Sequence, residues 1–567
     1  MQDFGTEQVV CMNQYIKSIC KAYETHIKRS MNRSRIIRVS FFLALLVSGS
    51  LHAQVTEYQG QTASGAYYLI AIPEGWTDAD NLVIWNHGYQ GYTSSEPKAN
   101  PSLGPLEDFV LDQGYAMAAS SFSQTGWAVF NSHIDNKELY EKFLELAEEP
   151  EKVFIQGASM GGIVSVRDLE AKLIPNVDGA LLMCGAVAGA ENWIEAFDLR
   201  MIYEAVCSDV NNGELPTDSW TEQPLPLLGE IQFFESLQQC TGLVADSYID
   251  GLLGKLLQTP EQLQRLNQIL ELTNTHKDFL LLNLGYAVFE IPSLVNDSTK
   301  LNGSKPFGNV SVDYGDEQIN KIVQRVIALP SANQQFLNNY TPSGDIGNTR
   351  IVSIHTSKDG LVRPANQQAL IKLLPADQLT TAIVVEEEPS HCSFTDGEGF
   401  AAWLELVSWV DGENQPTVTS LQSTCNEIDE DSGQCRFDPQ FQLADQLLTY
   451  PRIDSVSPAG VNSYDAITGI LAIESLVVSG DTSAYSLDLL PPADESVLFT
   501  IADVEKIEPF ALWQHQSTFV SEDLLLYLPQ VEIAPYTPGD TVYDVFMRYI
   551  SDGKQTGLEL IEYQSAP

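Results

Sequence analysis

Short apolar runs and longer amphipathic stretches alternate along much of the chain. Apolar runs of this length predict buried strands. The predicted core strands are 81–86, 152–155, 178–184, 349–355 and 380–385. Apolar residues at helical spacing in 163–173 predict a helix directly after the second strand. This order predicts an α/β fold in which residues 54–189 and 349–411 build one sheet with its helices.

The long segment between the third and fourth predicted strands has helical periodicity. Its apolar residues recur at spacings of three and four, with polar residues between them. The predicted helices are 193–206, 228–239, 247–257, 260–273 and 316–328. An insertion of this size after a core strand is typical of a cap, so residues 190–348 are predicted to be a helical cap. An unrelated helical domain inserted at this point is the alternative.

The pattern changes again after residue 411. Residues 412–451 are polar and acidic and predict a linker. From 452 to 567, alternating runs separated by Gly-Asp, Pro-Pro and Asp-Gly turns predict a small all-β module. Its predicted strands are 471–478, 497–501, 524–534, 542–550 and 558–563. A structural role for this module is favoured over binding of a polymer.

The first 53 residues have the pattern of a leader with a secretory signal. Three arginines (33, 35 and 38) precede the apolar run 39–47, and a small residue, Ala53, follows it. The run is too short to span a membrane. We therefore expect cleavage after Ala53 and a periplasmic or secreted protein without an integral membrane anchor. Met31 would begin a signal of ordinary length, so we expect the true start there. A long n-region that begins at residue 1 is the alternative.

The predicted mature chain is strongly acidic. Residues 1–53 contain seven Lys/Arg and three Asp/Glu, which leaves 23 basic and 73 acidic residues and a net charge of about −50. Such a charge repels phosphate groups, so nucleic acid and anionic membrane surfaces are not expected as partners. Solubility is the simplest reason for the charge.

The sequence Gly157-Ala158-Ser159-Met160-Gly161 lies between the second predicted strand and the helix after it. A G-x-S-x-G pattern in a strand–turn–helix context is typical of a serine nucleophile, whose strained turn needs small neighbours. Ser159 is therefore predicted to be the nucleophile. The alternative is a tight glycine turn that happens to contain a serine.

A nucleophilic serine needs a base and an orienting acid. Asp359 follows the fourth predicted strand, and His391 follows the fifth, so both are expected at the carboxyl edge of the sheet. We predict that His391 accepts the proton of Ser159 and that Asp359 orients His391. Glu388 is the nearest acidic rival, but it belongs to the run 386–388, which is expected to be solvated.

The first predicted strand ends in Asn86-His87-Gly88-Tyr89. The backbone N–H groups of Tyr89 and Met160 are the expected oxyanion donors, and the side chain of His87 is expected to support the loop. Candidates for the pocket wall are the large aromatic residues near the motifs: Tyr89, Trp127, Trp193 and Phe197.

With these motifs the chain resembles the α/β-hydrolase superfamily over roughly residues 55–190 and 349–412. The sequence His391-Cys392-Ser393-Phe394-Thr395 is similar to that of secreted serine esterases, and distantly to tannases and feruloyl esterases. The latter have a cysteine immediately before the nucleophile, where this chain has Ala158. The resemblance implies hydrolysis but does not extend to a tannin or ferulate substrate.

Six cysteines remain after the leader, an even number in an oxidising compartment. Cys425 and Cys435 close a short loop in the predicted linker and are expected to pair. Cys207 and Cys240 both lie in predicted cap helices, and a disulfide between them would join these helices. Cys184 and Cys392 then belong to one edge of the sheet and are predicted to form the third disulfide. A buried free thiol at Cys184 is the alternative.

These features together predict an exported serine hydrolase that cleaves carboxylic esters, soluble or polymeric, through an acyl-enzyme intermediate and without a cofactor. A polyester depolymerase or serine peptidase with the same triad, and a binding protein on a hydrolase scaffold, remain alternatives. No metal site is expected. Asp429, Asp431 and Gly433 resemble part of a calcium loop, but position twelve is Gln440 where such a loop has glutamate.

Overall fold

The computed structural model describes residues 54–90, 97–210, 215, 220, 224–225, 228–243, 258–428, 434–444, 450, 462–478, 481, 483–493, 497–507, 517–521, 523–534, 536–537, 539–551 and 555–566. The predicted leader, its cleavage site after Ala53 and the predicted helix 247–257 lie outside these residues.

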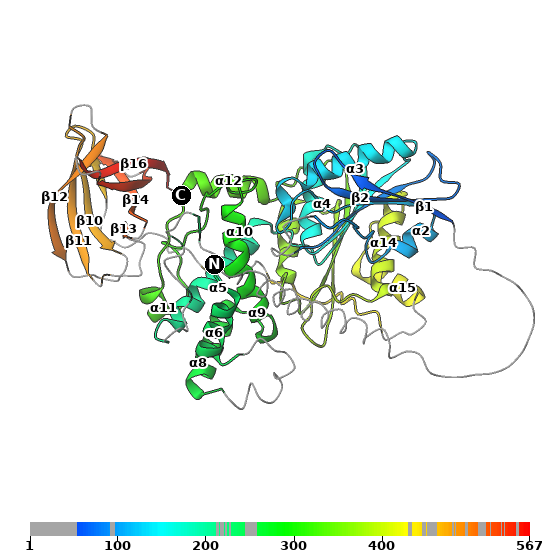
Figure 1. The fold of residues 1–567 in the computed structure, drawn as a ribbon, viewed down its shortest axis with the longest axis horizontal. Coiled ribbons are helices and arrows are strands. Elements are labelled where there is room, and N and C mark those ends of the chain that lie inside the picture. Colours follow the sequence, from blue (N-terminus) through cyan, green and yellow to red (C-terminus); the bar gives the residue numbers. More distant parts are fainter. Residues whose placement is uncertain are drawn as a thin grey trace, which may run out of the picture. The chain divides into compact units, whose positions relative to one another are not determined.

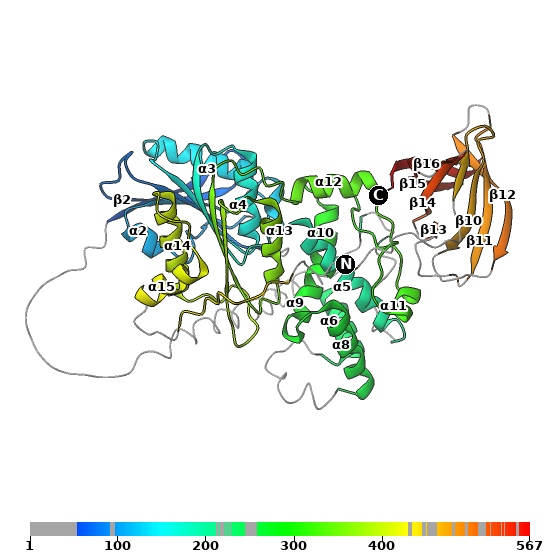
Figure 2. The same ribbon diagram turned by 180° about the vertical axis from the view of Figure 1, so that it is seen from behind.

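Eight strands form the sheet of the α/β region (Figures 1 and 2). They are β1 (Val55–Gln61), β2 (Tyr67–Pro73), β3 (Leu82–Asn86), β4 (Ala116–Ser120), β5 (Val153–Ala158), β6 (Val177–Met183), β7 (Arg350–Thr356) and β8 (Leu379–Val384). Their order is β1-β2-β4-β3-β5-β6-β7-β8. The pairs β1–β2 and β2–β4 are antiparallel, and all later pairs are parallel. Together with the helices on both faces, this is an α/β-hydrolase fold, as the sequence predicted.

Helices cover both faces of this sheet. Successive strand residues point to opposite faces, so Ile84 and Ile155 pack with α3 (Ser132–Leu146) and α4 (Met160–Ala171). Val83 and Phe154 pack instead with α14 (Asp396–Val410) and α15 (Val418–Ile428). Shorter elements complete the region: α2 (Glu107–Asp112), η1 (Ala128–Phe130), η4 (Pro364–Asn366) and α13 (Gln367–Leu373). Burial on both faces explains why the central strands are continuously apolar.

The described residues between β6 and β7 are largely helical. Its helices are α5 (Ala190–Cys207), α6 (Glu230–Thr241), α8 (Pro260–Thr273), α9 (Lys277–Gly285), the π-helical η3 (Tyr286–Glu290), α10 (Ile291–Asn296), α11 (Glu317–Ile322) and α12 (Pro330–Tyr340). Helix α8 has the predicted bounds, with a capping box between Thr259 and Gln262. Helix α11 is shorter than the predicted 316–328, because the backbone becomes extended at Val323.

One stretch of the described residues, Lys277–Asn296, is long and apolar enough to cross a membrane by length and composition. Buried core helices of soluble proteins can have the same length and composition. In this stretch, 61% of the most apolar window is buried inside the protein, and Leu284, Val288 and Ile291 belong to the same core as α5. Its hydrophobicity is therefore explained by packing within the cap.

Part of the predicted linker 412–451 is integral to the α/β region. Helix α15 buries Leu421 and Cys425 in the same core as α14, and Phe437 forms an isolated bridge with Val384. Residues 429–433, which include the calcium-like pattern, lie outside the described residues. The linker prediction was wrong for 418–428 because it followed the acidic composition of the whole segment. The apolar residues of 418–428 have helical spacing.

The C-terminal region forms an all-β module, as predicted. Its strands are β9 (Ser463–Asp465), β10 (Leu471–Val478), β11 (Ala484–Leu490), β12 (Leu498–Ile507), β13 (Ser517–Val520), β14 (Leu525–Ala534), β15 (Tyr543–Ser551) and β16 (Thr556–Ser565). They follow the order β11-β12-β16-β15-β14-β13-β10-β9, and an additional β10–β11 pairing closes the sheet into a barrel. Its interior contains alternate residues of facing strands, such as Ile473, Leu489 and Leu528.

Candidate active site

Ser159 stands at the turn between β5 and α4 in a strained backbone conformation, with φ 55° and ψ −123°. The turn requires both glycines of the motif. A Cβ added at Gly157 would lie 2.2 Å from the carbonyl oxygen of Gly161, and one at Gly161 would lie 2.0 Å from that of Asn86. The motif therefore lets the start of α4 pack directly against the end of β3.

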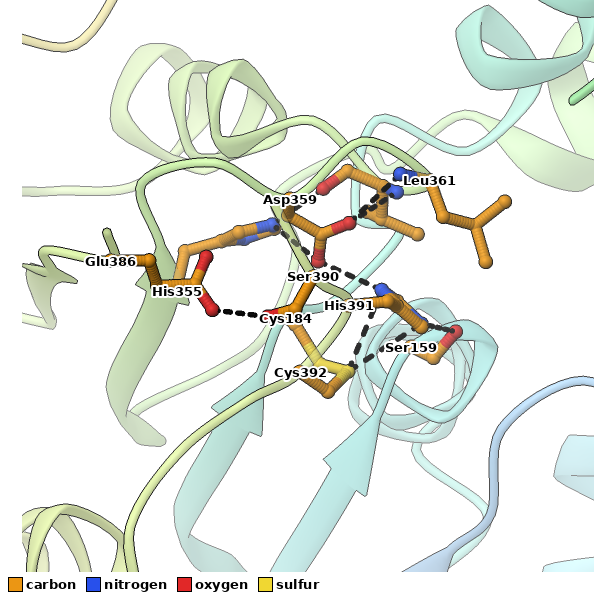
Figure 3. The surroundings of a disulfide bond; sticks show 10 residues. Ser159, Cys184, His355, Asp359, Leu361, Glu386, Ser390, His391 and Cys392 are labelled. Atoms are coloured by element: carbon orange, nitrogen blue, oxygen red, sulfur yellow. Dashed lines mark hydrogen bonds and ion pairs between the residues drawn. A yellow bond between two sulfur atoms is a disulfide. The ribbon is translucent and has the colours of Figure 1, made fainter. Parts of the chain in front are cut away.

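His391 connects Ser159 to Asp359 (Figure 3). Its Nε2 atom lies 3.0 Å from the Oγ of Ser159, and its Nδ1 atom lies 2.8 Å from the Oδ2 of Asp359. The three side chains come from the loops after β5, β8 and β7, which meet at the carboxyl edge of the parallel strands. This is the hydrogen-bonded arrangement in which an imidazole can take a proton from a serine hydroxyl.

The carboxylate of Asp359 is buried and held by four groups. Its Oδ1 accepts hydrogen bonds from the backbone N–H groups of Leu361 and Val362, at 3.0 and 2.9 Å. Its Oδ2 faces His391 and lies 3.6 Å from the Nε2 of His355. Burial alone would raise the pKa of Asp359, but the charge of His391 and the hydrogen bonds from both histidines lower it to about 2. Asp359 is therefore ionised at neutral pH.

Glu386, the first residue of the run 386–388, links the acid loop to the base loop. The hydroxyl of Ser390 donates to its Oε1, and the backbone N–H of Lys358 donates to its Oε2 at 3.3 Å. It is only 4% exposed, whereas Glu388 is exposed as expected. Burial raises the pKa of Glu386. The expectation of a solvated run was thus wrong for this residue, whose burial depends on its contacts with Ser390 and Lys358.

The base loop is fastened at Cys392, which forms a disulfide with Cys184 at a Cα–Cα distance of 5.4 Å. Both cysteines have positive φ, so each stands at a sharp turn. The Sγ of Cys392 lies 3.5 Å from the Nε2 of His391 (Figure 3). The structure also contains the pairs Cys207–Cys240 and Cys425–Cys435. The disulfide therefore ties the loop that carries the base to the end of β6, beside the nucleophile strand.

The motif 391–395 ends at Thr395, where the base loop leads into α14. Thr395 forms a capping box with Glu398 at the start of α14. Arg436 donates to both Glu398 and the carbonyl oxygen of Ser393, at 2.8 and 2.7 Å. Arg436 lies in the segment that was predicted to be a linker, so this segment helps to hold the base loop.

The loop after β3 passes close to the nucleophile. A Cβ added at Gly88 would lie 3.3 Å from the Cβ of Ser159. His87 supports the loop as expected, because its ring packs on Phe122 and its Nδ1 lies 2.6 Å from the carbonyl oxygen of Gly88. Burial lowers the pKa of His87 and favours its neutral ring. Tyr89 and Met160 both line the cavity beside Ser159, which is where the two expected oxyanion donors would be needed.

A buried polar network lies behind this loop. The side chain of Asn86 donates to Ser165 and Asp168, at 3.0 and 2.9 Å, and that of Asn136 donates to Asp168 at 2.7 Å. The hydroxyl of Ser165 donates to the carbonyl oxygen of Gly161 at 2.7 Å. Burial raises the pKa of Asp168 to about 7, although the hydrogen bonds from the two asparagines oppose this shift. The network joins β3, α3 and α4 around the nucleophile turn.

A cavity of about 100 Å³ opens on Ser159. Its walls come from α5, η3, the loop after β3, the loop after Asp359 and Tyr450. The rings of Trp127 and Trp193 pack edge to face at 5.3 Å, and Tyr286 packs on Tyr89 at 5.1 Å. The remaining lining residues are Met160, Ala186, Asn192, Glu195, Ala196, Leu199, Thr273, Thr275, Asn283, Leu361, Val362 and Arg363.

Three of the four predicted wall residues line this cavity: Tyr89, Trp127 and Trp193. Phe197 does not. It is 1% exposed and packs between Trp220 and Phe307, at 5.0 and 5.7 Å, in the interior of the cap. Phe197 lies one helical turn after Trp193 on α5, but at that level of the helix its ring is covered by Trp220 and Phe307. Tyr286, Arg363 and Tyr450 were not predicted, since no local motif marks them.

No protein-family model matches the chain, and no curated protein matches its sequence. Solved structures similar to it include TT1662 from Thermus thermophilus, with 11% identity, a TM-score of 0.30 and coverage of 64% of this chain and 100% of that one. The esterase LipA from Xanthomonas oryzae has 15% identity, a TM-score of 0.29 and coverage of 63% and 87%. Candida antarctica lipase A has 14% identity, a TM-score of 0.34 and coverage of 71% and 83%.

Proposed function

We propose that the protein is a serine hydrolase that cleaves carboxylic esters through Ser159, His391 and Asp359. The observation that carries this proposal is the hydrogen-bond relay in which His391 contacts Ser159 Oγ at 3.0 Å and Asp359 Oδ2 at 2.8 Å. The relay faces a largely apolar cavity, which suits the uncharged body of an ester.

In the proposed reaction, His391 removes the proton of Ser159 while the Oγ atom attacks the ester carbonyl. The backbone N–H groups of Tyr89 and Met160 stabilise the resulting oxyanion. His391 then donates its proton to the departing alcohol, and the acyl group remains on Ser159. Water, activated by His391, attacks this acyl-enzyme, releases the acid and restores the serine hydroxyl.

Asp359 has a positioning and electrostatic role in this reaction. Because its Oδ2 accepts from His391 Nδ1, the proton of the neutral ring is held on Nδ1 and the lone pair of Nε2 faces Ser159. Its ionised carboxylate also stabilises the imidazolium that forms after proton transfer. The low pKa of Asp359 keeps it from taking that proton itself.

The esterase proposal is tested by substrate class. We expect hydrolysis of p-nitrophenyl esters of graded chain length, with little hydrolysis of peptide p-nitroanilides. Rapid cleavage of the anilides with slow cleavage of the esters would instead assign a serine peptidase with the same triad. A lack of both activities in folded protein would favour a binding protein on a hydrolase scaffold.

Export is part of the same proposal. The three disulfides of the described residues suit an oxidising compartment, and the leader pattern at 33–53 predicts cleavage after Ala53. The likeness to esterases with a histidine–cysteine motif is supported by the disulfide at Cys392, although its partner is Cys184 and not the residue before the nucleophile. N-terminal sequencing of the exported protein should begin at or near Gln54; a mature chain that retains Cys11 and Cys20 would contradict this proposal.

A further inference from the structure

The wall of the cavity contains an ion pair, Glu195–Arg363. Glu195 and Arg363 are the charged residues among the described residues that line the cavity. Their Oε1 and Nη1 atoms lie 3.6 Å apart, which is longer than an ordinary N–H···O hydrogen bond of about 2.9 Å. Their side chains are 13% and 18% exposed, so the pair is largely enclosed by the protein.

The position of Arg363 is fixed by a second contact. Its Nη2 donates to the carbonyl oxygen of Thr273 at 2.7 Å, at the end of α8. The guanidinium is therefore already oriented before any substrate enters. An arginine held in this way loses little side-chain entropy when another of its N–H groups binds an acceptor.

Both residues of the pair line the cavity that opens on Ser159, but neither belongs to the triad. The backbone N–H of Ala186 donates to the carbonyl oxygen of Ser159 at 3.0 Å, so the chain leaves the nucleophile just before α5 begins at Ala190. Glu195 is five residues further along, about 7.5 Å along the helix axis. Apolar and aromatic residues such as Trp193 and Tyr286 also line the cavity. We therefore infer that a group that contacts the pair is a part of the substrate other than the carbonyl at Ser159.

Charge decides which chemical group suits this position. The carboxylate and the guanidinium together are neutral, so a charged ligand would be repelled by one of them. The net charge of −46 also disfavours anionic substrates. A hydroxyl group both accepts and donates, so a single hydroxyl can accept from Arg363 and donate to Glu195. Hydrogen bonds to charged partners are roughly twice as strong as those between neutral groups.

We propose that Glu195 and Arg363 form a subsite for a hydroxyl group, and that the preferred substrate is an uncharged ester with a hydroxyl remote from the scissile carbonyl. This inference rests on the proposed esterase function. The same chemistry suits a hydroxyl on the acyl chain or on the alcohol, and these two sources are separated by the test.

The test compares kcat/KM for matched pairs of esters. One arm pairs p-nitrophenyl alkanoates with ω-hydroxyalkanoates of equal length; the other pairs alkyl with ω-hydroxyalkyl esters of one acid. In one arm we expect the hydroxylated ester to be favoured by about 10- to 100-fold at the best length, mainly through KM. The variants Glu195→Gln and Arg363→Met should each reduce this ratio to near one.

Arg265→Met is the matched control, because Arg265 pairs with Asp209 on the cap and is not among the cavity-lining residues. It should retain the wild-type ratio. If Arg363→Met fails to fold after losing its contact with Thr273, Glu195→Gln decides the question. A ratio near one in the wild type at every length in both arms, or an unchanged ratio in the folded variants, would overturn the subsite. Wild-type hydrolysis of the plain esters would in that case leave the esterase proposal intact, whereas failure to hydrolyse any ester would remove both.

Discussion

The Nε2 atom of His355 lies 3.6 Å from the Oδ2 atom of Asp359, the same oxygen that faces His391. His355 is fully buried on β7, and its Nε2 also lies 2.7 Å from the carbonyl oxygen of Val362. It thus contacts the acid and the loop that follows it (Figure 3). We infer that His355 is a positioning residue for Asp359.

Replacement of His355 should therefore weaken catalysis without abolishing it. For His355→Gln we expect kcat to fall roughly tenfold with little change in KM, because the substitution alters both the contact with Asp359 and the support of the loop at Val362. Steady-state kinetics on a short p-nitrophenyl ester measures this. His133→Gln is a control at another histidine, outside the cavity lining. Equal kcat in the wild type and the His355 variant would show that His355 only fills space.

Asp359→Asn should have a much larger effect. The amide can donate to His391 Nδ1 and so favours the wrong tautomer, and it cannot stabilise the imidazolium. We expect kcat to fall by about 10⁴-fold, the size seen for such a change in another serine hydrolase, while KM changes little. A variant that retains a tenth or more of the wild-type kcat would remove Asp359 from the triad.

The disulfide at the base loop gives a prediction about reduction. Cys184–Cys392 anchors the loop that carries His391. The double variant Cys184→Ala/Cys392→Ala should therefore have a lower kcat at temperatures where its melting curve shows that it is still folded. The double variant Cys425→Ala/Cys435→Ala serves as the control, because it removes a disulfide between residues that are ten positions apart in the sequence. If both double variants lose kcat only where they also unfold, the Cys184–Cys392 disulfide has no specific role in holding the base loop.

Asp168 predicts a pH dependence of stability. Its pKa in the folded protein is about 7, raised mainly by burial from an ordinary value of 3.8. Between about pH 4 and pH 7 this carboxyl group is protonated in the folded state and ionised in the unfolded state. Its stabilising contribution is therefore fully present below about pH 4. Its contribution is lost as the pH rises through 7, by at most about 1.4 kcal/mol per pH unit.

The Asp168→Asn variant should lack this component, because the amide oxygen can still accept from Asn86 and Asn136 but does not titrate. Melting temperatures of the two proteins between pH 4 and 8 provide the measurement. The wild type should lose more stability than the variant as the pH rises. Identical pH slopes would show that Asp168 titrates normally in the folded protein.

The sheet and the triad were predictable because they depend on local patterns. Continuous apolar runs mark strands buried on both faces, and each triad residue follows such a strand at the carboxyl edge. The strained turn at Ser159 needs small residues within two positions, so it leaves a motif in the sequence. The three cysteine pairs followed from the same topology, which brings Cys184 and Cys392 to one edge.

The surroundings of the triad were harder to predict because they depend on contacts between distant segments. Arg436 donates to Glu398, and Arg363 donates to the carbonyl oxygen of Thr273. No spacing in the sequence predicts either of these partners. Phe197 looked like a wall residue because aromatic character alone does not distinguish the cavity face of α5 from its core face. Glu386 belongs to an acidic run whose composition predicted exposure to solvent, and its burial depends on contacts with Ser390 and Lys358.

Covalent labelling of Ser159 tests the central claim most directly. A fluorophosphonate probe reacts with a serine that is activated by a neighbouring base. Peptide mapping of the labelled wild-type protein should find the probe on Ser159 alone. Folded Ser159→Ala should take up no probe and lose ester turnover by several orders of magnitude. Labelling at another residue, or ester hydrolysis that survives Ser159→Ala, would contradict the assignment of the active site.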